Sequence, residues 1–229
     1  MKKIFWASDS TVKTNNISTY PQTGMGQVLS LYLHTDVCIC NHAENGRSTK
    51  KFLAEGRLDN IKKEIKEGDF LFIEFGHNDW HHDPERHTEA FFDYKDNLKV
   101  FVNTAKEVGA YPVLITPLYC RFFDEEGKLK EKVHFDYPEA MKEVAKEENV
   151  PCIDLCEKSY QLLLNTHPMI SESWYMNLPP NTFSNYPEGK IDNAHLQYTG
   201  AVTMAGLIAE GLKELGGIYK ELLCDFAVK

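Results

Sequence analysis

The sequence lacks any apolar run of the roughly 18 residues that a membrane-crossing helix needs. Lys2-Lys3 is followed by apolar residues only over 4–7, too few for the apolar core of a secretory signal, and these residues suit a strand better. Basic residues are also scarce, 25 against 34 acidic ones, for a formal net charge of −9. Since such a surface repels phosphates and anionic lipids, we expect a cytoplasmic protein that binds neither nucleic acid nor membranes.

The six cysteines include no C-x-x-C pair, the spacing typical of zinc and redox sites. They stand at positions 38, 40, 120, 152, 156 and 224. Cys38, Cys40 and Cys152 fall inside apolar runs. We therefore expect free, buried thiols in a reducing compartment and not disulfides or a zinc site.

Signatures of several common enzyme classes are also absent. There is no G-x-S-x-G, the nucleophile elbow of α/β-hydrolases, and no Walker A motif. Gly24-Met25-Gly26 lacks both the third glycine and the preceding strand of a dinucleotide-binding fingerprint. With 42% apolar residues and no repeat or low-complexity tract, the chain is expected to form one domain over residues 1–229.

What the chain does contain is an alternation of short apolar runs and amphipathic segments. Polar residues do not alternate within the runs, as in strands buried on both faces. The predicted strands are 4–7, 37–40, 70–75, 113–116 and 150–155, and the predicted helices are 26–33, 50–66, 94–108, 137–148, 155–164 and 199–215. This alternation predicts a three-layer α/β/α sandwich around a central five-stranded parallel sheet.

Two irregular segments interrupt the alternation, residues 79–87 (DWHHDPERH) and 166–190. Loops of this length are usually functional, and they would emerge at the carboxyl ends of the strands, where open α/β sheets bind ligands. The rings of Trp80, Trp174 and Tyr175 are candidates for stacking on sugars, or else they pack the loops down. Arg47 is a candidate for binding a uronate, or else it lies on a solvated helix face.

Four polar clusters would gather at this edge of the sheet. They are 8–11 (SDST), 41–48 (NHAENGRS), 76–79 (GHND) and 192–195 (DNAH). Acyl transfer by serine needs a hydroxyl, a base, a group that orients the base, and donors for the oxyanion. Ser10, His195 and Asp192 are the candidates for the first three. The donors would be the N–H groups of Ser10 and Gly46 and the side-chain amide of Asn78.

Each of these residues also has a structural interpretation. Ser10 and His195 could cap helices, and Asp9 and Asp79 are rival partners for His195 that suit a loop-bracing role better. His77 is interpreted as structural. The residues His77, Asp79, His81, His82, Asp83 and His87 suggest a metal site, but they lie in a proline-containing loop and reverse the Gly-Asn-His order of metallophosphoesterases.

Taken together, the four blocks resemble the SGNH (GDSL-type) hydrolase superfamily. Within it, the chain is similar to the rhamnogalacturonan acetylesterase-like branch through residues 20–27 (YPQTGMGQ), 45–48 (NGRS) and 75–79 (FGHND). The resemblance implies a flavodoxin-like fold and a serine esterase without metal or cofactor. It further implies small acetylated substrates, such as pectic or other plant-derived oligosaccharides including rhamnogalacturonan fragments.

Two departures from the family pattern affect this interpretation. Ser8 stands where the family usually has glycine and would be strained if that position needs a positive φ. Asn45 replaces another frequent glycine, but asparagine tolerates left-handed backbone. Three rival functions remain: a lipase- or thioesterase-like hydrolase of longer acyl chains, an inactive carbohydrate-binding homologue, and a metal-dependent phosphoesterase. The oligomeric state is not predicted.

Overall fold

A computed structural model describes residues 2–228 of the chain. Its centre is a five-stranded parallel sheet in the order β2-β1-β3-β4-β5. The strands are β1 (Lys2–Ala7), β2 (Val37–Asn41), β3 (Phe70–Glu74), β4 (Tyr111–Ile115) and β5 (Cys152–Ile153). The chain winds outward from β1 to β2 and then crosses back to β3, so the strand order reverses between β1 and β3. In open α/β sheets the crevice at this switch point is the usual ligand site.

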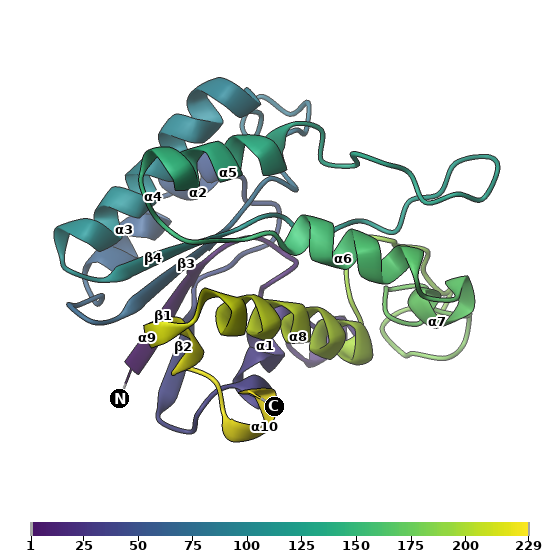
Figure 1. The fold of residues 1–229 in the computed structure, drawn as a ribbon. Coiled ribbons are helices and arrows are strands. Elements are labelled where there is room, and N and C mark those ends of the chain that lie inside the picture. Colours follow the sequence, from purple (N-terminus) through teal and green to yellow (C-terminus); the bar gives the residue numbers. More distant parts are fainter. Residues whose placement is uncertain (1, 229) are drawn as a thin grey trace.

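Helices cover both faces of the sheet, which confirms the predicted three-layer α/β/α sandwich (Figure 1). One layer contains α2 (Thr49–Ala54), α3 (Arg57–Lys62), α4 (Lys95–Glu107) and α5 (Tyr137–Glu147). The other contains α1 (Met25–Val28), α6 (Leu155–Leu164) and α8 (Tyr198–Leu215). Short helices α7 (Pro168–Glu172), α9 (Gly217–Lys220) and α10 (Asp225–Val228) and the 3-10 turns Ile17–Thr19 and Leu29–Tyr32 complete the chain, and a distorted turn, Ala90–Tyr94, opens α4.

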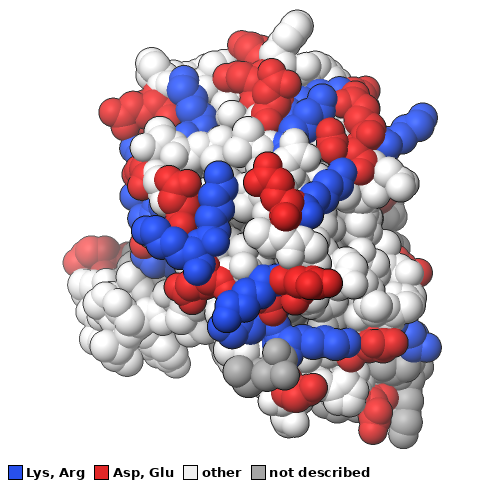
Figure 2. Space-filling model, turned by 90° about the vertical axis from the view of Figure 1, so that its left-hand side faces the viewer, with Lys and Arg blue, Asp and Glu red and all other residues white. Residues whose placement is uncertain are grey.

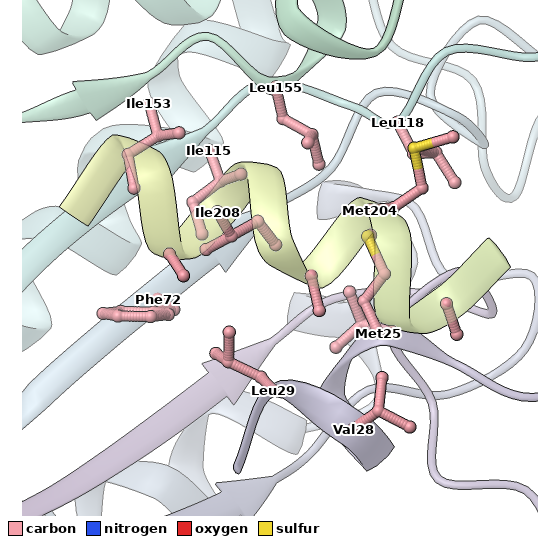
Figure 3. Close-up of a cluster of buried hydrophobic side chains, with 14 of the residues drawn as sticks. Met25, Val28, Leu29, Phe72, Ile115, Leu118, Ile153, Leu155, Met204 and Ile208 are labelled. Carbon is pink, nitrogen blue, oxygen red and sulfur yellow. The ribbon is translucent and has the colours of Figure 1, made fainter. Parts of the chain in front are cut away.

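Alternate residues of each strand supply the two halves of the core. Ile4 and Trp6 of β1 face the α8 layer, whereas Phe5 and Ala7 face the α4 layer, and all four side chains are fully buried. In Figure 3, Met204 and Ile208 of α8 lie against side chains from the sheet and from α1. Burying one such side chain contributes roughly 1.5–3 kcal/mol to folding, so the two clusters hold the two helix layers against the sheet.

Several predicted boundaries were wrong for local reasons. The segment 50–66 is two helices because Gly56, at φ +66°, turns the chain between α2 and α3. The segment 26–33 is divided between α1 and a 3-10 turn, and β5 has only two residues. The segment predicted to be irregular at 166–190 contains α7 and a pairing of Leu178 with Lys190.

The prediction of uniformly buried cysteines was also wrong. All six are free, but β2 is an edge strand, and Cys38 on it is exposed. Cys40 and Cys152 are half-buried, and Cys120 is buried. An edge strand has a neighbour on one side alone, so an apolar run there is less deeply covered than the same run in β3.

The net negative charge is not gathered in one place on the face seen in Figure 2, where acidic and basic side chains are interspersed. Many surface charges are paired, for example Lys95 with Glu143 and Glu147 at 2.9 and 2.6 Å. Such exposed pairs contribute at most about 1 kcal/mol each, so the core and not the surface stabilises the fold. Within residues 2–228, no helix combines the length and the apolar character needed to cross a bilayer.

Candidate active site

The turn that follows β1 carries Ser10, which is 7% exposed. The turn is closed by hydrogen bonds from the N–H groups of Val12 and Lys13 to the carbonyl oxygen of Asp9, at 3.3 and 3.1 Å. The start of α1 packs tightly against it: a Cβ at Gly24 would lie 2.1 Å from the Lys13 carbonyl oxygen. Only glycine permits this approach, so the segment before α1 holds the turn in place.

Ser10, His195 and Asp192 form a continuous hydrogen-bonded chain at this edge. Nε2 of His195 lies 2.9 Å from Oγ of Ser10, and Nδ1 lies 2.8 Å from Oδ2 of Asp192. Oδ1 of Asp192 accepts the backbone N–H groups of Ala194 and His195, each at 3.0 Å. Because Nδ1 donates to the carboxylate, Nε2 is left to accept the proton of the Ser10 hydroxyl.

The carboxyl group of Asp192 is held in its ionised form. Burial raises its pKa, but the hydrogen bond and charge of His195 and a hydrogen bond from Lys190 outweigh burial, and the pKa lies well below its usual range. Nζ of Lys190 is 2.8 Å from Oδ2, the same oxygen that His195 contacts. An ionised Asp192 keeps the proton of the neutral imidazole on Nδ1.

The two ends of the chain meet through backbone pairing. Gln22 pairs with Gln197, and the N–H of Thr23 donates to the carbonyl of Leu196 at 2.9 Å. On the other side, the N–H of Met176 donates to the carbonyl of His195 at 2.9 Å. The segment that carries His195 is thus fixed between the loop before α1 and the loop after α7.

Arg121 also holds this segment in place. It is 7% exposed, and its guanidinium donates to Oδ1 of Asn193, Oγ of Ser171 and the carbonyl of Pro168, at 3.1, 3.0 and 2.9 Å. Its backbone N–H also donates to the carbonyl of Asn193 at 2.8 Å. Because Asn193 follows Asp192 directly, Arg121 ties the candidate triad to α7.

Asn78 lies beside the Ser10 turn with both ends of its amide engaged. Nδ2 donates to Oδ2 of Asp9 at 2.9 Å, and Oδ1 accepts from Nη1 of Arg86 at 3.3 Å. These contacts fix the orientation of the amide and leave one Nδ2 hydrogen free to donate. Gly46, at φ +71°, would place a Cβ 3.9 Å from the same Arg86 nitrogen, so Gly46 and Asn78 both lie close to the Arg86 guanidinium.

The rival carboxylates Asp9 and Asp79 brace loops, as expected. Oδ1 of Asp9 accepts the N–H and hydroxyl of Thr11, both at 2.9 Å. Asp79 accepts the N–H groups of Thr49 and Gly76, at 3.0 and 3.1 Å, and burial raises its pKa to about 7. Neither carboxylate is bonded to His195, whose Nδ1 faces Asp192.

Ser8 is not strained, contrary to the possibility raised by its replacement of a family glycine. The non-glycine residues of positive φ in the described chain are Lys132, Phe135, Asn149 and Asn181. The Ser8 hydroxyl instead contacts the carboxyl of Glu74, which is fully buried beneath the turn. Burial and the neighbouring Asp9 raise the pKa of Glu74 to about 8. A protonated Glu74 at neutral pH adds no negative charge below the site.

Metal-type donors meet at one place in the described part of the chain, where atoms of His77, Cys120 and His134 lie within 4.8 Å of one another. Nε2 of His134 is 2.7 Å from the Leu118 carbonyl oxygen and must donate to it. Burial raises the pKa of Cys120 well above its usual range and lowers that of His134 to about 3. This chemistry suits a neutral, hydrogen-bonded wall, in keeping with a structural His77, better than a metal-binding site.

The structure changes the choice of sugar-binding candidates. Tyr175 is fully buried, and its hydroxyl donates to the Tyr119 carbonyl at 2.8 Å. Trp174 is 8% exposed and belongs to the core. The prediction that these two rings stack on a sugar was therefore wrong, and both pack the loop down. Nε and Nη2 of Arg47 both bond Glu55 at 2.9 Å, which compensates the charge expected to bind a uronate. Trp80 is half-buried and packs edge-on against Phe135, with ring centroids 5.6 Å apart.

The sequence interpretation missed four residues of this region: Arg86, Arg121, Phe135 and Lys190. Arg86 lies inside the His- and Asp-rich stretch 79–87, and it is the one basic residue there besides the histidines. Lys190 precedes Asp192 by two residues, and this short separation is the sequence signal that points to it. Nothing in the local pattern marks Arg121, because its partners lie about 50 and 72 positions away.

Comparisons with known proteins agree with this geometry. The model of the GDSL-like lipase/acylhydrolase family matches residues 9–182. The chain is 41% identical to the rhamnogalacturonan acetylesterase RhgT of Bacillus subtilis, over 97% of this chain and 96% of that protein. It is 42% identical to the probable rhamnogalacturonan acetylesterase YesY of the same organism, with 93% of each chain covered.

The fold has a solved counterpart in the crystal structure of Bacillus subtilis YxiM. The TM-score is 0.79 at 27% identity, with 94% of this chain and 57% of that chain covered. A family match over more than half of the chain, together with two nearly full-length relatives above 40% identity, leaves no ambiguity of class. The protein belongs to the GDSL-like lipase/acylhydrolase family and is a serine-dependent carboxylic ester hydrolase.

Proposed function

We propose that the protein removes acetyl groups from acetylated plant oligosaccharides, such as rhamnogalacturonan fragments, with Ser10 as nucleophile. The observation that carries the proposal is the chain of contacts from Ser10 Oγ to His195 Nε2 and from His195 Nδ1 to Asp192, at 2.9 and 2.8 Å. The names of the relatives RhgT and YesY support the acetyl group and the pectic substrate.

In the first half-reaction, His195 takes the proton of the Ser10 hydroxyl as Oγ attacks the acetyl carbonyl carbon. The carbonyl electron pair moves to oxygen, and the oxyanion is held by the N–H groups of Ser10 and Gly46 and by Nδ2 of Asn78. When the tetrahedral intermediate collapses, the bond to the sugar oxygen breaks and that oxygen takes the proton from His195. An acetyl ester on Ser10 remains.

In the second half-reaction, water replaces the sugar. His195 accepts a proton from the water as its oxygen attacks the acetyl carbon, and the same three donors hold the new oxyanion. Collapse breaks the bond to Ser10, His195 returns the proton to Oγ, and acetate leaves. His195 must be neutral to start either step, so we expect activity to fall in acid.

Asn78→Ala should lower kcat by roughly 100- to 1,000-fold, because it removes an oriented donor that acts on the developing charge. KM for the same ester should change little, since the interaction strengthens only in the transition state. The matched control is Asn45→Ala, which truncates an exposed asparagine next to Gly46. Steady-state rates on p-nitrophenyl acetate distinguish the two, and a KM effect without a kcat effect would contradict the proposed role.

Trp80 is the remaining candidate for contact with a sugar ring, together with Phe135. Phe135 is 59% exposed and holds a left-handed φ of +50°, a costly conformation for a bulky residue and one that often marks functional loops. Trp80 lies two residues after the proposed oxyanion donor Asn78 in the chain, and its ring contacts that of Phe135. An exposed aromatic face suits the apolar side of a sugar ring.

We expect Trp80→Ala to raise KM for an acetylated oligosaccharide by roughly 5- to 30-fold, the loss of about 1–2 kcal/mol of ring contact. The kcat/KM for p-nitrophenyl acetate should stay within about twofold, because that ester has no sugar to bind. Tyr111→Ala is the matched control, a partly exposed ring at the amino end of β4, on the opposite edge of the sheet. Equal losses on both substrates would argue against a sugar contact.

The length of the acyl chain is tested with p-nitrophenyl acetate, butyrate and octanoate. Acetate should be the preferred ester, and a clear preference for octanoate would favour the lipase-like alternative.

For the compartment, we propose the cytoplasm, which is supported by six free cysteines that a reducing environment keeps as thiols. Cell fractionation with an antibody to the protein tests this.

A further inference from the structure

Lys190 stands in an unusual position relative to the candidate triad. Its ammonium and the imidazole of His195 contact the same atom, Oδ2 of Asp192, each at 2.8 Å. The two nitrogen atoms are therefore at most about 5.6 Å apart, the sum of the two distances. A fixed positive charge this close acts directly on any proton that His195 takes up.

The position of Lys190 is built into the fold and does not depend on a free side chain. Its backbone N–H and carbonyl both bond Leu178, at 2.9 and 2.8 Å. Its ammonium lies 5.4 Å from the centre of the Tyr186 ring. The side chain is 31% exposed, whereas that of Asp192 is 14% exposed, so solvent screens this interaction only in part.

Asp192 has no oxygen left for another partner. Oδ1 receives two backbone N–H groups, and Oδ2 receives Lys190 and His195. Two other titratable groups interact electrostatically with Asp192: His77 after β3, which also interacts with His195, and Cys120 after β4. Asp9 after β1 interacts with both His77 and Cys120. Among the described lysines and arginines, Lys190 alone pairs with Asp192.

We propose that Lys190 is a positioning residue that acts through Asp192 and keeps His195 neutral at a lower pH than an isolated Asp–His pair would. An aspartate alone favours the imidazolium. A lysine on the same oxygen offsets part of that negative charge and repels the imidazolium, so the neutral base persists into weakly acidic solution. The inference rests on the proposed roles of Ser10, His195 and Asp192 and adds a device that sets the acidic limit of activity.

The test is the pH profile of kcat/KM for p-nitrophenyl acetate, which reports the free enzyme. In Lys190→Gln and Lys190→Met, the pH at which activity is half lost on the acid side should rise by roughly half to one unit. Lys190→Arg keeps the charge and should retain the wild-type profile. The matched control is Lys142→Gln, which removes a lysine paired with another aspartate, Asp154, at 3.1 Å.

A lysine that only stabilised the loop would lower activity or the unfolding temperature without moving the acid limb. The proposal is overturned if both neutral variants, folded by circular dichroism, keep the wild-type limb, or if Lys190→Arg shifts it as far as Lys190→Gln does. A different experiment tests the proposed function itself: if Ser10→Ala still hydrolyses the ester, the proposed roles of Ser10, His195 and Asp192 are refuted. Failure of the one is therefore distinguishable from failure of the other.

Discussion

Ser10→Ala should lower kcat on an acetylated oligosaccharide by about 10⁴- to 10⁶-fold, because no covalent intermediate can form without the hydroxyl. Binding should survive, since Ser10 is 7% exposed and offers little surface to the substrate. The measurement is acetate release from a panel of acetylated oligosaccharides, including rhamnogalacturonan fragments and neutral xylo-oligosaccharides. The panel also identifies the preferred sugar.

The neighbouring serine supplies the control for this substitution. Ser8→Ala makes the same chemical change two residues earlier, but it removes a contact with Glu74 and should reduce stability more than turnover. An organophosphate should label the wild-type protein once, at Ser10, and should not label Ser10→Ala. Stoichiometric labelling excludes an inactive sugar-binding protein, whereas an unreactive Ser10 would refute the esterase mechanism.

Asp192→Asn is the second large effect, a loss of about 10⁴-fold in kcat with the fold retained. The reason lies in the backbone donors: Ala194 and His195 direct two N–H groups at Oδ1, so the one oxygen of an asparagine must stay there. Its NH₂ group then faces Nδ1 of His195 and forces the proton onto Nε2. In that tautomer the imidazole cannot accept the proton of Ser10.

Asp79→Asn is the matched control, since Asp79 is one of the two buried carboxylates, with Asp9, that were rival partners for His195. Its pKa is raised to about 7, so a neutral amide resembles the form that is already half populated at neutral pH. We expect a lower unfolding temperature and a kcat within about tenfold of wild type. Circular dichroism melts and p-nitrophenyl acetate rates measure both; a larger kcat loss in Asp79→Asn than in Asp192→Asn would reverse the assignment.

Much of the site was predictable because it depends on local order. Ser10 and Asn78 follow β1 and β3, and the carboxyl ends of adjacent parallel strands lie at one edge of a sheet. The same reasoning brought His195, which precedes α8, to that edge across 185 positions. Which residues reach this edge depends on the order of strands and helices along the chain, so they could be predicted without side-chain geometry.

The errors arose where neighbours in space decide the outcome. Trp174 and Tyr175 look like exposed loop aromatics in sequence, yet the approach of α8, where Gly200 packs against the Trp174 backbone, buries them. Apolar residues in β2 suggest a buried strand, but strand order makes β2 an edge. Apolar pattern alone carries no information on which strand is central.

By itself the sequence determined the layered parallel sheet and the four polar clusters at its carboxyl edge, because both follow from apolar periodicity and chain order. The tertiary structure alone decided which groups surround them: Lys190 on Asp192, Arg86 on Asn78, Arg121 on Asn193 and Glu74 beneath Ser8. A hydrogen bond depends on positions within a few tenths of an ångström, and distant segments reach such positions only when the whole core is packed.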